Sequence, residues 1–248
     1  MSDHIQNLAF RLHPSSSDTR LPNEGRLDGE IDDPQDRHLQ LRPAPVGGIL
    51  KRLVDITLAM TAIVFLLPVI AATALLVWLS GRGPIIYRQT RVGYVGVPFT
   101  CFKFRTMVVD ADAALKAYLD HSPDAAREWR ATRKLKRDPR VTAIGSFLRK
   151  SSLDELPQLW NVLKGDMSCV GPRPVPADEL ADYGTDTVSY LSARPGVTGL
   201  WQTTGRNTLR YDERVALDVA YVRNWSIWLD LKIILKTIPA AMRTDQTS

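Results

Sequence analysis

LVDITLAMTAIVFLLPVIAATALLVWL, residues 53–79, is the longest apolar run of the chain, and its length and interruptions suggest the architecture. Its only charge is Asp55 and its only proline is Pro68. About 20 apolar residues suffice for a helix to cross a bilayer, so this run is long enough. Pro68 lies near the middle, where its missing N–H and its ring cost a helix roughly 3 kcal/mol and favour a kink. The run therefore predicts a membrane helix that is broken at Pro68.

The charges beside this run favour a re-entrant helix. Lys51 and Arg52 precede it, and three arginines follow it: Arg82, Arg88 and Arg91. A spanning helix normally carries its positive excess on one side only. Each half of the run, at ~1.5 Å per residue, reaches about 16 to 24 Å and falls short of the ~30 Å hydrocarbon core. We expect a hairpin-like anchor over residues 47–81 with both ends in the cytoplasmic headgroup zone. A single tilted transmembrane helix is the alternative, and a buried helix of a soluble domain is a more remote one.

Composition separates an acidic N-terminal tail from a basic body. Residues 1–49 carry five Arg, no Lys and eight acidic residues, about −3, so the rest of the +5 chain carries about +8. Residues 1–46 lack apolar periodicity and are predicted to be disordered; they do not resemble a signal peptide. A basic body suits anionic partners such as phospholipids or phosphorylated substrates. No nucleic-acid-binding module is recognisable. Two cysteines and a single body histidine, His121, disfavour a disulfide framework and a His-based triad.

The rest of the chain predicts an α+β fold that is mainly helical. A small β-hairpin is expected from residues 84–88 and 98–105, with Gly93 and Gly96 in its turn. Helices are expected at residues 108–120, 124–137, 152–164, 211–223 and 226–241. Helix 124–137 is strongly basic and helix 226–241 mixes Trp, Leu and Lys, so both are candidates for amphipathic helices at the membrane interface. For helix 124–137 the alternative is a basic face exposed to solvent. The proline-rich stretch 171–176 and the glycine-rich stretch 194–207 are expected to be loops. We assign residues 82–243 to a domain at the cytoplasmic face and residues 244–248 to a C-terminal tail.

The adjacent carboxylates Asp154 and Glu155 are the best candidates for chemistry. Taken alone, Ser152 and Glu155 match a capping box at the start of a helix, which needs no further function. Cations nearby favour a functional site over a simple helix cap. A helix N-terminus with arginines is an anion site, and an arginine fork binds phosphate. The basic candidates are Lys103, Arg105, Arg149, Arg173 and Arg206. Carboxylates in such surroundings can hold Mg²⁺ or attack phosphorus as nucleophiles.

Five segments that follow one another in the chain carry a more specific signal. They are KFRTM at 103–107, LRKSSLDELPQL at 148–159, NVLKGDMS at 161–168, VGPRP at 170–174 and RPGVTGLWQ at 194–202. Together they resemble the bacterial sugar transferase family, the monotopic phosphoglycosyl transferases, over roughly residues 48–243. The C-terminal part is most similar to members that transfer galactosyl or glucosyl phosphate for exopolysaccharide synthesis.

The resemblance implies an activity and a set of roles. Such enzymes move a sugar-1-phosphate from a UDP-sugar to undecaprenyl phosphate and release UMP, at the cytoplasmic face of the bacterial inner membrane. Asp154 would be the nucleophile that forms an aspartyl phospho-sugar, and Glu155 would support Mg²⁺ and proton handling. Arg149 and Arg173 would bind phosphate and Arg206 would face the nucleotide. Lys103, Arg105 and Gln202 lie in the same motifs and complete the expected substrate-binding set.

Three matters stay open at the level of sequence. The sugar is galactose or glucose, because no motif reports the orientation of a single hydroxyl group. The oligomeric state is undetermined, with a homodimer as one option. A non-catalytic module that binds the membrane surface is the alternative function, and a membrane-bound phosphohydrolase is a third.

Overall fold

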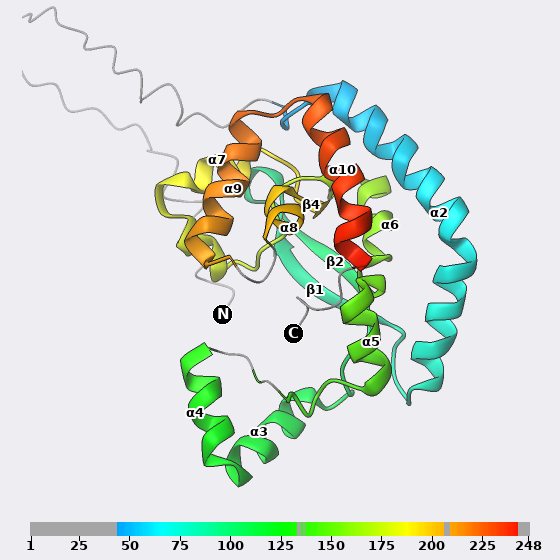
Figure 1. Ribbon diagram of the computed structural model, residues 1–248, viewed down its shortest axis with the longest axis vertical. Helices are drawn as coiled ribbons and strands as arrows, with labels where there is room; N and C mark the ends of the chain where they lie inside the picture. Colours follow the sequence, from blue (N-terminus) through cyan, green and yellow to red (C-terminus); the bar gives the residue numbers. More distant parts are fainter. Residues whose placement is uncertain (1–43, 133–134, 136, 206–208, 243–248) are drawn as a thin grey trace, which may run out of the picture. The chain divides into compact units, whose positions relative to one another are not determined.

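The computed structural model describes residues 44–132, 135, 137–205 and 209–242, all within the compact unit Leu39–Ser248. Most of the predicted N-terminal tail, the tail 244–248 and Arg206 lie outside these residues. The described part is mainly helical with a small β-hairpin, as predicted, and it has a second two-stranded sheet that was not predicted (Figure 1). One boundary was wrong: Val46, placed in the tail, is buried in the core and its backbone N–H donates to Ser192.

Helix α2 (Gly48–Leu79) is the long apolar helix. It continues through Pro68 without interruption, so the predicted break is not present; Figure 1 shows instead that the helix curves over its length. At ~1.5 Å per residue its 32 residues extend about 48 Å, enough for a membrane by length and composition. Its middle is exposed and apolar, with Val64 and Phe65 69% and 80% exposed. This surface has no protein to cover it within the described ranges.

The N-terminal end of α2 is fixed by a buried ion pair. Lys51 was expected among lipid headgroups, but it is 6% exposed and its Nζ lies 2.5 Å from an oxygen of the equally buried Asp230. Tyr221 and Trp225 donate to the same carboxylate at 2.7 and 3.1 Å. The expectation for Lys51 fails because the Asp230 carboxylate replaces water that the ammonium gives up, and the two further donors satisfy that carboxylate in turn.

Two further polar residues of α2 also serve the fold. Arg52 donates to the carbonyls of Val162 and Leu163, at 2.5 and 2.8 Å, near the end of helix α6 (Gln158–Lys164), where cations are favoured. Asp55 accepts from the Ser168 hydroxyl and the Cys169 N–H, both at 2.9 Å. The single charge in the apolar run thus joins α2 to strand β3 (Ser168–Val170).

The C-terminal end of α2 is fixed by Arg105. Its guanidinium donates to the carbonyls of Val77, Gly81 and Arg82, at 3.1, 2.8 and 3.0 Å. These bonds satisfy carbonyl groups where the helix ends. Both ends of α2 are therefore attached to the same folded body.

The predicted β-hairpin is present, although its first strand is displaced. Strand β1 spans Ile86–Val92 instead of 84–88, and β2 spans Pro98–Phe104. They pair antiparallel, with Arg91 opposite Phe99 and Tyr87 opposite Lys103. Gly96, with φ +81°, lies in the turn as expected.

The helices agree with the sequence except around the carboxylate pair. Helices α3 (Ala111–His121), α9 (Tyr211–Arg223) and α10 (Ile227–Met242) match three predicted segments closely, whereas α4 (Pro123–Thr132) ends five residues before the predicted end at 137. Helix α5 (Ala143–Ser151) was not predicted, and the predicted helix 152–164 is divided into the 3₁₀ turn η3 (Leu153–Glu155) and α6. The second predicted loop, 194–207, contains strand β4 (Gly196–Thr198) and helix α8 (Leu200–Thr204). Two short elements that were not predicted, η4 (Glu179–Asp186) and α7 (Thr187–Leu191), follow the first predicted loop.

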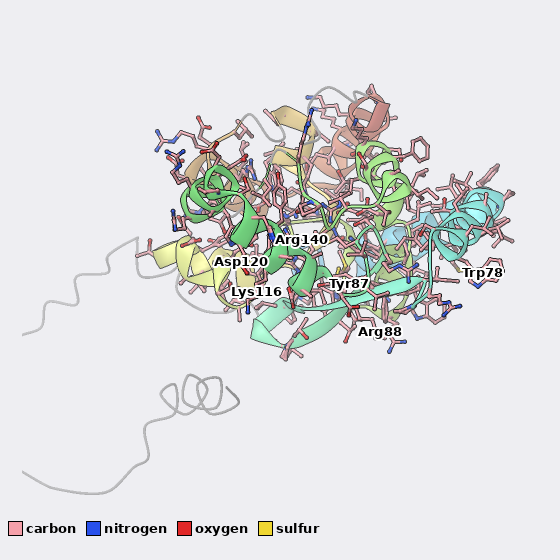
Figure 2. All side chains as sticks on the ribbon, turned by 90° about the horizontal axis from the view of Figure 1, so that it is seen from below. Trp78, Tyr87, Arg88, Lys116, Asp120 and Arg140 are labelled. Carbon is pink, nitrogen blue, oxygen red and sulfur yellow. The ribbon has the colours of Figure 1, made fainter. Side chains whose placement is uncertain are left out.

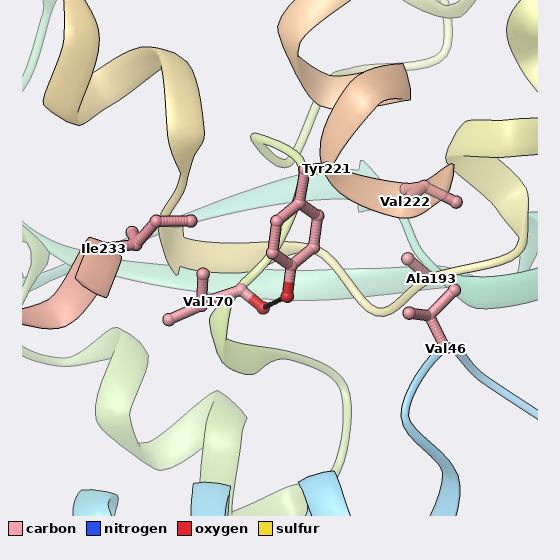
Figure 3. Packing of buried hydrophobic residues seen from close by; sticks show 6 residues of the cluster. All are labelled: Val46, Val170, Ala193, Tyr221, Val222 and Ile233. Atoms are coloured by element: carbon pink, nitrogen blue, oxygen red, sulfur yellow. Dashed lines mark hydrogen bonds between the residues drawn. The ribbon is translucent and has the colours of Figure 1, made fainter. Parts of the chain in front are cut away.

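A parallel pair of strands brings the two predicted loops together. β3 pairs with β4, Ser168 opposite Gly196 and Val170 opposite Thr198. A Cβ on Gly196 would lie 2.1 Å from the backbone N of Gly171, so only glycine permits this approach. The Tyr221 hydroxyl donates to the Val170 carbonyl at 3.0 Å within an apolar core (Figure 3) that also contains Val46, Ala193, Val222 and Ile233. This core holds the loop 171–176 beside residues 194–199.

We expect the Lys51→Met variant to lose about 3 to 5 kcal/mol of unfolding free energy, because it leaves the Asp230 carboxylate buried without its cation. The measurement is unfolding by a denaturing detergent in mixed micelles. Lys232→Met is the matched control, since Lys232 is exposed on the same helix as Asp230 and its loss should change stability by less than about 0.5 kcal/mol. Equal stability of the two variants would show that the ion pair does not hold α2.

Candidate functional site

The carboxylate pair occupies a tight turn between two helices. Ser152 ends α5 in the left-handed conformation, φ 56°, with its N–H directed to the Leu148 and Arg149 carbonyls. Its side chain makes no capping hydrogen bond, so the predicted capping box was wrong: the helix starts later, after Pro157. Asp154 and Glu155 lie in the 3₁₀ turn that follows. Their place is set by the turn between α5 and α6, and a left-handed serine beside them fits the strain common at functional sites.

Glu155 is held by a lysine from the hairpin. Lys103 Nζ lies 2.6 Å from Glu155 Oε1, and the buried Gln158 donates to the same carboxylate. Burial acts to raise the pKa of Glu155, but Lys103 and Arg173 outweigh it and hold the pKa below its ordinary value. Glu155 is therefore an ionised carboxylate at neutral pH.

Asp154 behaves differently although it is the next residue in sequence. It is 8% exposed. Burial and the adjacent Glu155 raise its pKa to about 6, against the opposing effect of Lys103 and Arg149. A carboxylate that loses its proton only near pH 6 is more basic than an ordinary aspartate. Unlike Glu155, Asp154 forms no ion pair among the described residues. Neighbouring carboxyl groups whose pKa values are pushed apart are typical of catalytic pairs.

Arg149 reaches the site because α5 lies unusually close to the end of β2. A Cβ on Gly145 would lie 2.0 Å from the Thr106 carbonyl oxygen. Arg149, one turn later on α5, donates its Nε to the Thr106 hydroxyl at 2.9 Å, while its side chain remains exposed. The guanidinium thus has a fixed direction and free access to solvent and ligands.

Arg173 is positioned through its backbone. Asp218, 2% exposed on α9, accepts from the Arg173 backbone N–H at 3.4 Å and from the Tyr183 hydroxyl at 2.9 Å. Burial raises the pKa of Asp218 to about 7. The guanidinium of Arg173 lies 5.7 Å from the ring centroid of the buried Trp201, close enough for a cation–π contact. The proline-flanked arginine is therefore presented from a rigid loop, as its sequence suggests.

Two hollows meet at the carboxylate pair. The larger is an open groove of about 2010 Å³. Its polar lining includes the carboxylate pair with Lys103, Arg149, Arg173 and Gln202. Its apolar lining includes Leu58, Ala62 and Leu66 of α2 together with Leu159 and Ile234. The smaller hollow, about 30 Å³, lies against Glu155 and shares Lys103, Arg173 and Gln202 with the groove. A polar site and an apolar surface of α2 are thus parts of one concave surface.

Most of the predicted site residues are brought together. The groove is lined by Asp154, Glu155, Lys103, Arg105, Arg149, Arg173 and Gln202. Arg105 differs from the others, because its guanidinium is taken up by the carbonyls that end α2. We therefore leave it out of the phosphate site proposed below.

One basic residue at the site was missed. Arg91 was counted as a charge flanking the membrane helix, but it lies in β1 and lines the smaller hollow. The signal that could have identified it is strand alternation: positions 89 and 91 share a face of the hairpin with positions 101 and 103.

The two carboxylates are a small donor set for a metal ion. Within the described ranges, no group of three or more His, Cys, Asp or Glu side chains could hold one. Mg²⁺ often takes only one or two protein carboxylates and completes its shell with substrate phosphates and water. The ionised Glu155 beside Asp154, next to cations that suit phosphate, fits such a partly built site.

Comparison with known proteins matches residues 46–244 to the family described as Bacterial sugar transferase. The chain is 51% identical over 196 residues to the "Exopolysaccharide production protein ExoY" of Rhizobium meliloti, covering 79% of this chain and 87% of that protein. It is 50% identical over 196 residues to the "Undecaprenyl-phosphate galactose phosphotransferase" of Salmonella typhimurium, which covers 79% of this chain and 41% of that longer protein. It is 39% identical over 228 residues to the "UDP-glucose:undecaprenyl-phosphate glucose-1-phosphate transferase" of Caulobacter vibrioides, covering 86% and 79%.

We expect the carboxyl of Asp154 to titrate with a midpoint of about 6. In the Glu155→Gln variant the midpoint should fall toward the ordinary aspartate value, because ionised Asp154 then no longer faces a neighbouring negative charge. The measurement is a pH titration by ¹³C NMR of protein labelled at aspartate carboxyl carbons, with Asp154→Asn to assign the signal.

Asp120→Asn is the control for that titration, since Asp120 is exposed on α3 (Figure 2) and its charge should not affect Asp154. A midpoint that stays unchanged when Glu155 is neutralised would show that the two carboxylates do not interact.

Proposed function

This chain belongs to the bacterial sugar transferase family and is a phosphoglycosyl transferase, and from its site we propose that Asp154 carries the transferred group. The donor is a UDP-sugar and the acceptor is undecaprenyl phosphate, as the names of its relatives indicate. The sugar is galactose or glucose. The product would be the lipid-linked sugar that starts an exopolysaccharide, in agreement with the similarity to ExoY.

The observation that carries this proposal is the difference between the two carboxylates. Glu155 is neutralised by Lys103 at 2.6 Å, whereas Asp154 is buried, bears no such close partner among the described hydrogen bonds, and has a pKa of about 6. Above pH 6 it is an ionised, poorly solvated carboxylate, which suits a nucleophile.

The proposed reaction has two displacements at phosphorus. In the first, an oxygen of Asp154 bonds to the phosphorus that bears the sugar, and the bond from that phosphorus to the bridging oxygen breaks. The electron pair leaves with UMP. In the second, an oxygen of undecaprenyl phosphate bonds to the same phosphorus, and the bond to Asp154 breaks, which restores the carboxylate.

The other residues of the site suit the charge that these steps involve. Arg149 and Arg173 offer guanidinium groups that neutralise phosphate oxygens as they approach Asp154. Lys103 and Gln202 line the same groove and complete the substrate-binding surface. Mg²⁺, held by Glu155 and Asp154 together with substrate oxygens, would neutralise further phosphate charge when bound.

The membrane arrangement that we propose is re-entrant. Lys51 joins the start of α2 to α10, and Arg105 joins its end to the hairpin. A polar body attached to both ends of one helix cannot lie on both sides of a bilayer without carrying charges through it. Both ends therefore lie at one face, which we assign to the cytoplasm where nucleotide sugars are made, and the exposed apolar middle enters the lipid. The exposed Trp228 and Leu235 of α10 suit contact with the same interface.

This arrangement puts both substrates within reach of one carboxylate. The polar lining of the groove suits the nucleotide sugar, and the half-buried Leu58, Ala62 and Leu66 of the membrane helix suit the lipid acceptor. A lipid phosphate could approach Asp154 without leaving the interface.

Asp154→Asn should abolish UMP release from UDP-sugars, by more than about 10³-fold, because a neutral amide cannot form the phosphoryl bond. Membrane association should stay normal. The measurement is UMP release by purified protein in nanodiscs with undecaprenyl phosphate and a panel of UDP-sugars, with Asp182→Asn, an exposed acid on η4, as the control. Near-normal turnover in Asp154→Asn would exclude the covalent mechanism. Liposome binding without UMP release from any UDP-sugar in the wild type would favour the non-catalytic membrane module.

The topology can be tested with single cysteines at the two ends of α2. In a Cys101→Ala/Cys169→Ala background, Leu50→Cys and Leu79→Cys, exposed by 56% and 62%, should both react with an impermeant maleimide in inverted membrane vesicles and not in intact spheroplasts. Phe65→Cys, in the middle of the helix, should react in neither preparation. Labelling of the two ends from opposite sides would establish a spanning helix.

A further inference from the structure

The smaller hollow beside Glu155 is built from residues of several elements. Arg91 and Lys103 come from the hairpin, Gln158 from α6, Arg173 from the proline-rich loop, and Gln202 from α8. Its volume of about 30 Å³ admits a water-sized group. Since Lys103, Glu155, Arg173 and Gln202 also line the groove, an oxygen of a ligand in the groove can enter this hollow.

The charges around the hollow favour an anion. Three cations and one carboxylate line it, and Lys103 is already paired with that carboxylate at 2.6 Å. Arg91 donates its Nη2 to the neutral Gln89 amide oxygen at 2.6 Å. Burial lowers the pKa of the Arg91 guanidinium and the nearby Arg173 lowers it further, while Glu179 acts in the opposite direction. The partly buried Arg91 thus lies near the exposed Arg173 with little compensating negative charge, which an anionic group would supply.

The fold fixes Arg91 in this place. It is opposite Phe99 in the hairpin, on the face that carries Lys103, whereas Arg88 is on the other face. The next residue, Val92, donates its N–H to the Val175 carbonyl at 2.9 Å and accepts from the Tyr190 hydroxyl at 2.8 Å. These bonds tie the end of β1 to the loop that carries Arg173.

We propose that Arg91, together with Arg173, binds the phosphate group that leaves with the nucleotide. This inference rests on the proposed function, in which the bridging oxygen takes the electron pair as its bond to the sugar-bearing phosphorus breaks. In such an in-line displacement the leaving oxygen lies opposite the attacking one. Glu155 lines both the groove and the smaller hollow, whereas Asp154 lines the groove alone, so the hollow adjoins the reacting centre and leaves the place beside the nucleophile to the sugar-bearing phosphate. Arg91 is therefore a binding residue for UMP.

The test separates binding from turnover by using the Asp154→Asn background. Calorimetric titration of this protein with UMP, in nanodiscs, gives the affinity without any reaction. Adding Arg91→Gln should weaken UMP binding about 10- to 100-fold, the loss expected for a charge-assisted hydrogen bond of roughly 1.5 to 3 kcal/mol. Arg91→Lys should restore part of it, because the charge is kept and the fork is lost.

Arg223→Gln is the control, because Arg223 is an exposed arginine of α9 that lines neither the groove nor the smaller hollow. It should leave UMP affinity unchanged. In the otherwise native enzyme, Arg91→Gln should also raise the inhibition constant of UMP as a product. UMP affinity within twofold of the parent in Arg91→Gln, with an unchanged melting temperature, would overturn the proposal.

Failure of this inference can be told apart from failure of the proposed function. If Arg91→Gln is too unstable to assay, Arg91→Lys is compared with Arg223→Lys. Reduced UMP affinity in Arg91→Lys alone would support the proposal, and equal affinities would overturn it. If the wild type releases no UMP from any UDP-sugar, the transferase assignment fails, whereas the calorimetric experiment still reports whether Arg91 binds the nucleotide phosphate.

Discussion

Lys51 and Asp230 meet 2.5 Å apart where neither side chain is more than slightly exposed, and this ion pair joins an apolar helix of 32 residues to the folded body. Removing either partner would leave a buried charge, so the association is strongly specified although a buried pair adds little net stability by itself. Tyr221 and Trp225 direct the carboxylate, and Asp55, 4.0 Å from Lys51, extends the network to β3. With Arg105 at the other end of α2, this network keeps both ends of the helix on one body and leaves its middle apolar and exposed.

The same attachment brings the site to the side of the helix. β3 is held to α2 through Asp55, β4 pairs with β3, and Gly171 and Gly196 let the two loops touch. A groove that runs from an ionised carboxylate pair to the apolar side of α2 is the result. In the function that we propose, a soluble nucleotide sugar and a lipid phosphate must reach the same carboxylate, and a groove with both charged and apolar lining suits the two.

The chemistry of the site depends on an asymmetry that adjacent positions in sequence do not show. Asp154 and Glu155 are next to each other, but Lys103 approaches only one of them closely, and burial then acts with opposite net results on their pKa values. Arg173 shows the same dependence on distant residues, since its backbone is held by Asp218 and its side chain by Trp201. Arg105 and Arg91 differ from expectation for the same reason. Arg105, expected to bind substrate, donates to carbonyls at the end of α2, and Arg91, expected only to flank the membrane helix, lines the hollow beside Glu155.

The order of motifs, the apolar helix, the hairpin and helices α3, α4, α9 and α10 could be read from local patterns, because periodicity, turn residues and motif spacing are properties of neighbouring residues. The family and the carboxylate pair followed from the same information. The left-handed Ser152 that divides the predicted helix 152–164 and the burial of Lys51 could not, because the first depends on packing around a turn and the second on Asp230, 179 residues away. The unbroken course of α2 through Pro68 also went against the local pattern. Charges whose partners are distant in sequence acquire their roles only when the chain folds, since a side chain's pKa and hydrogen bonds are set by what lies within a few ångströms of it.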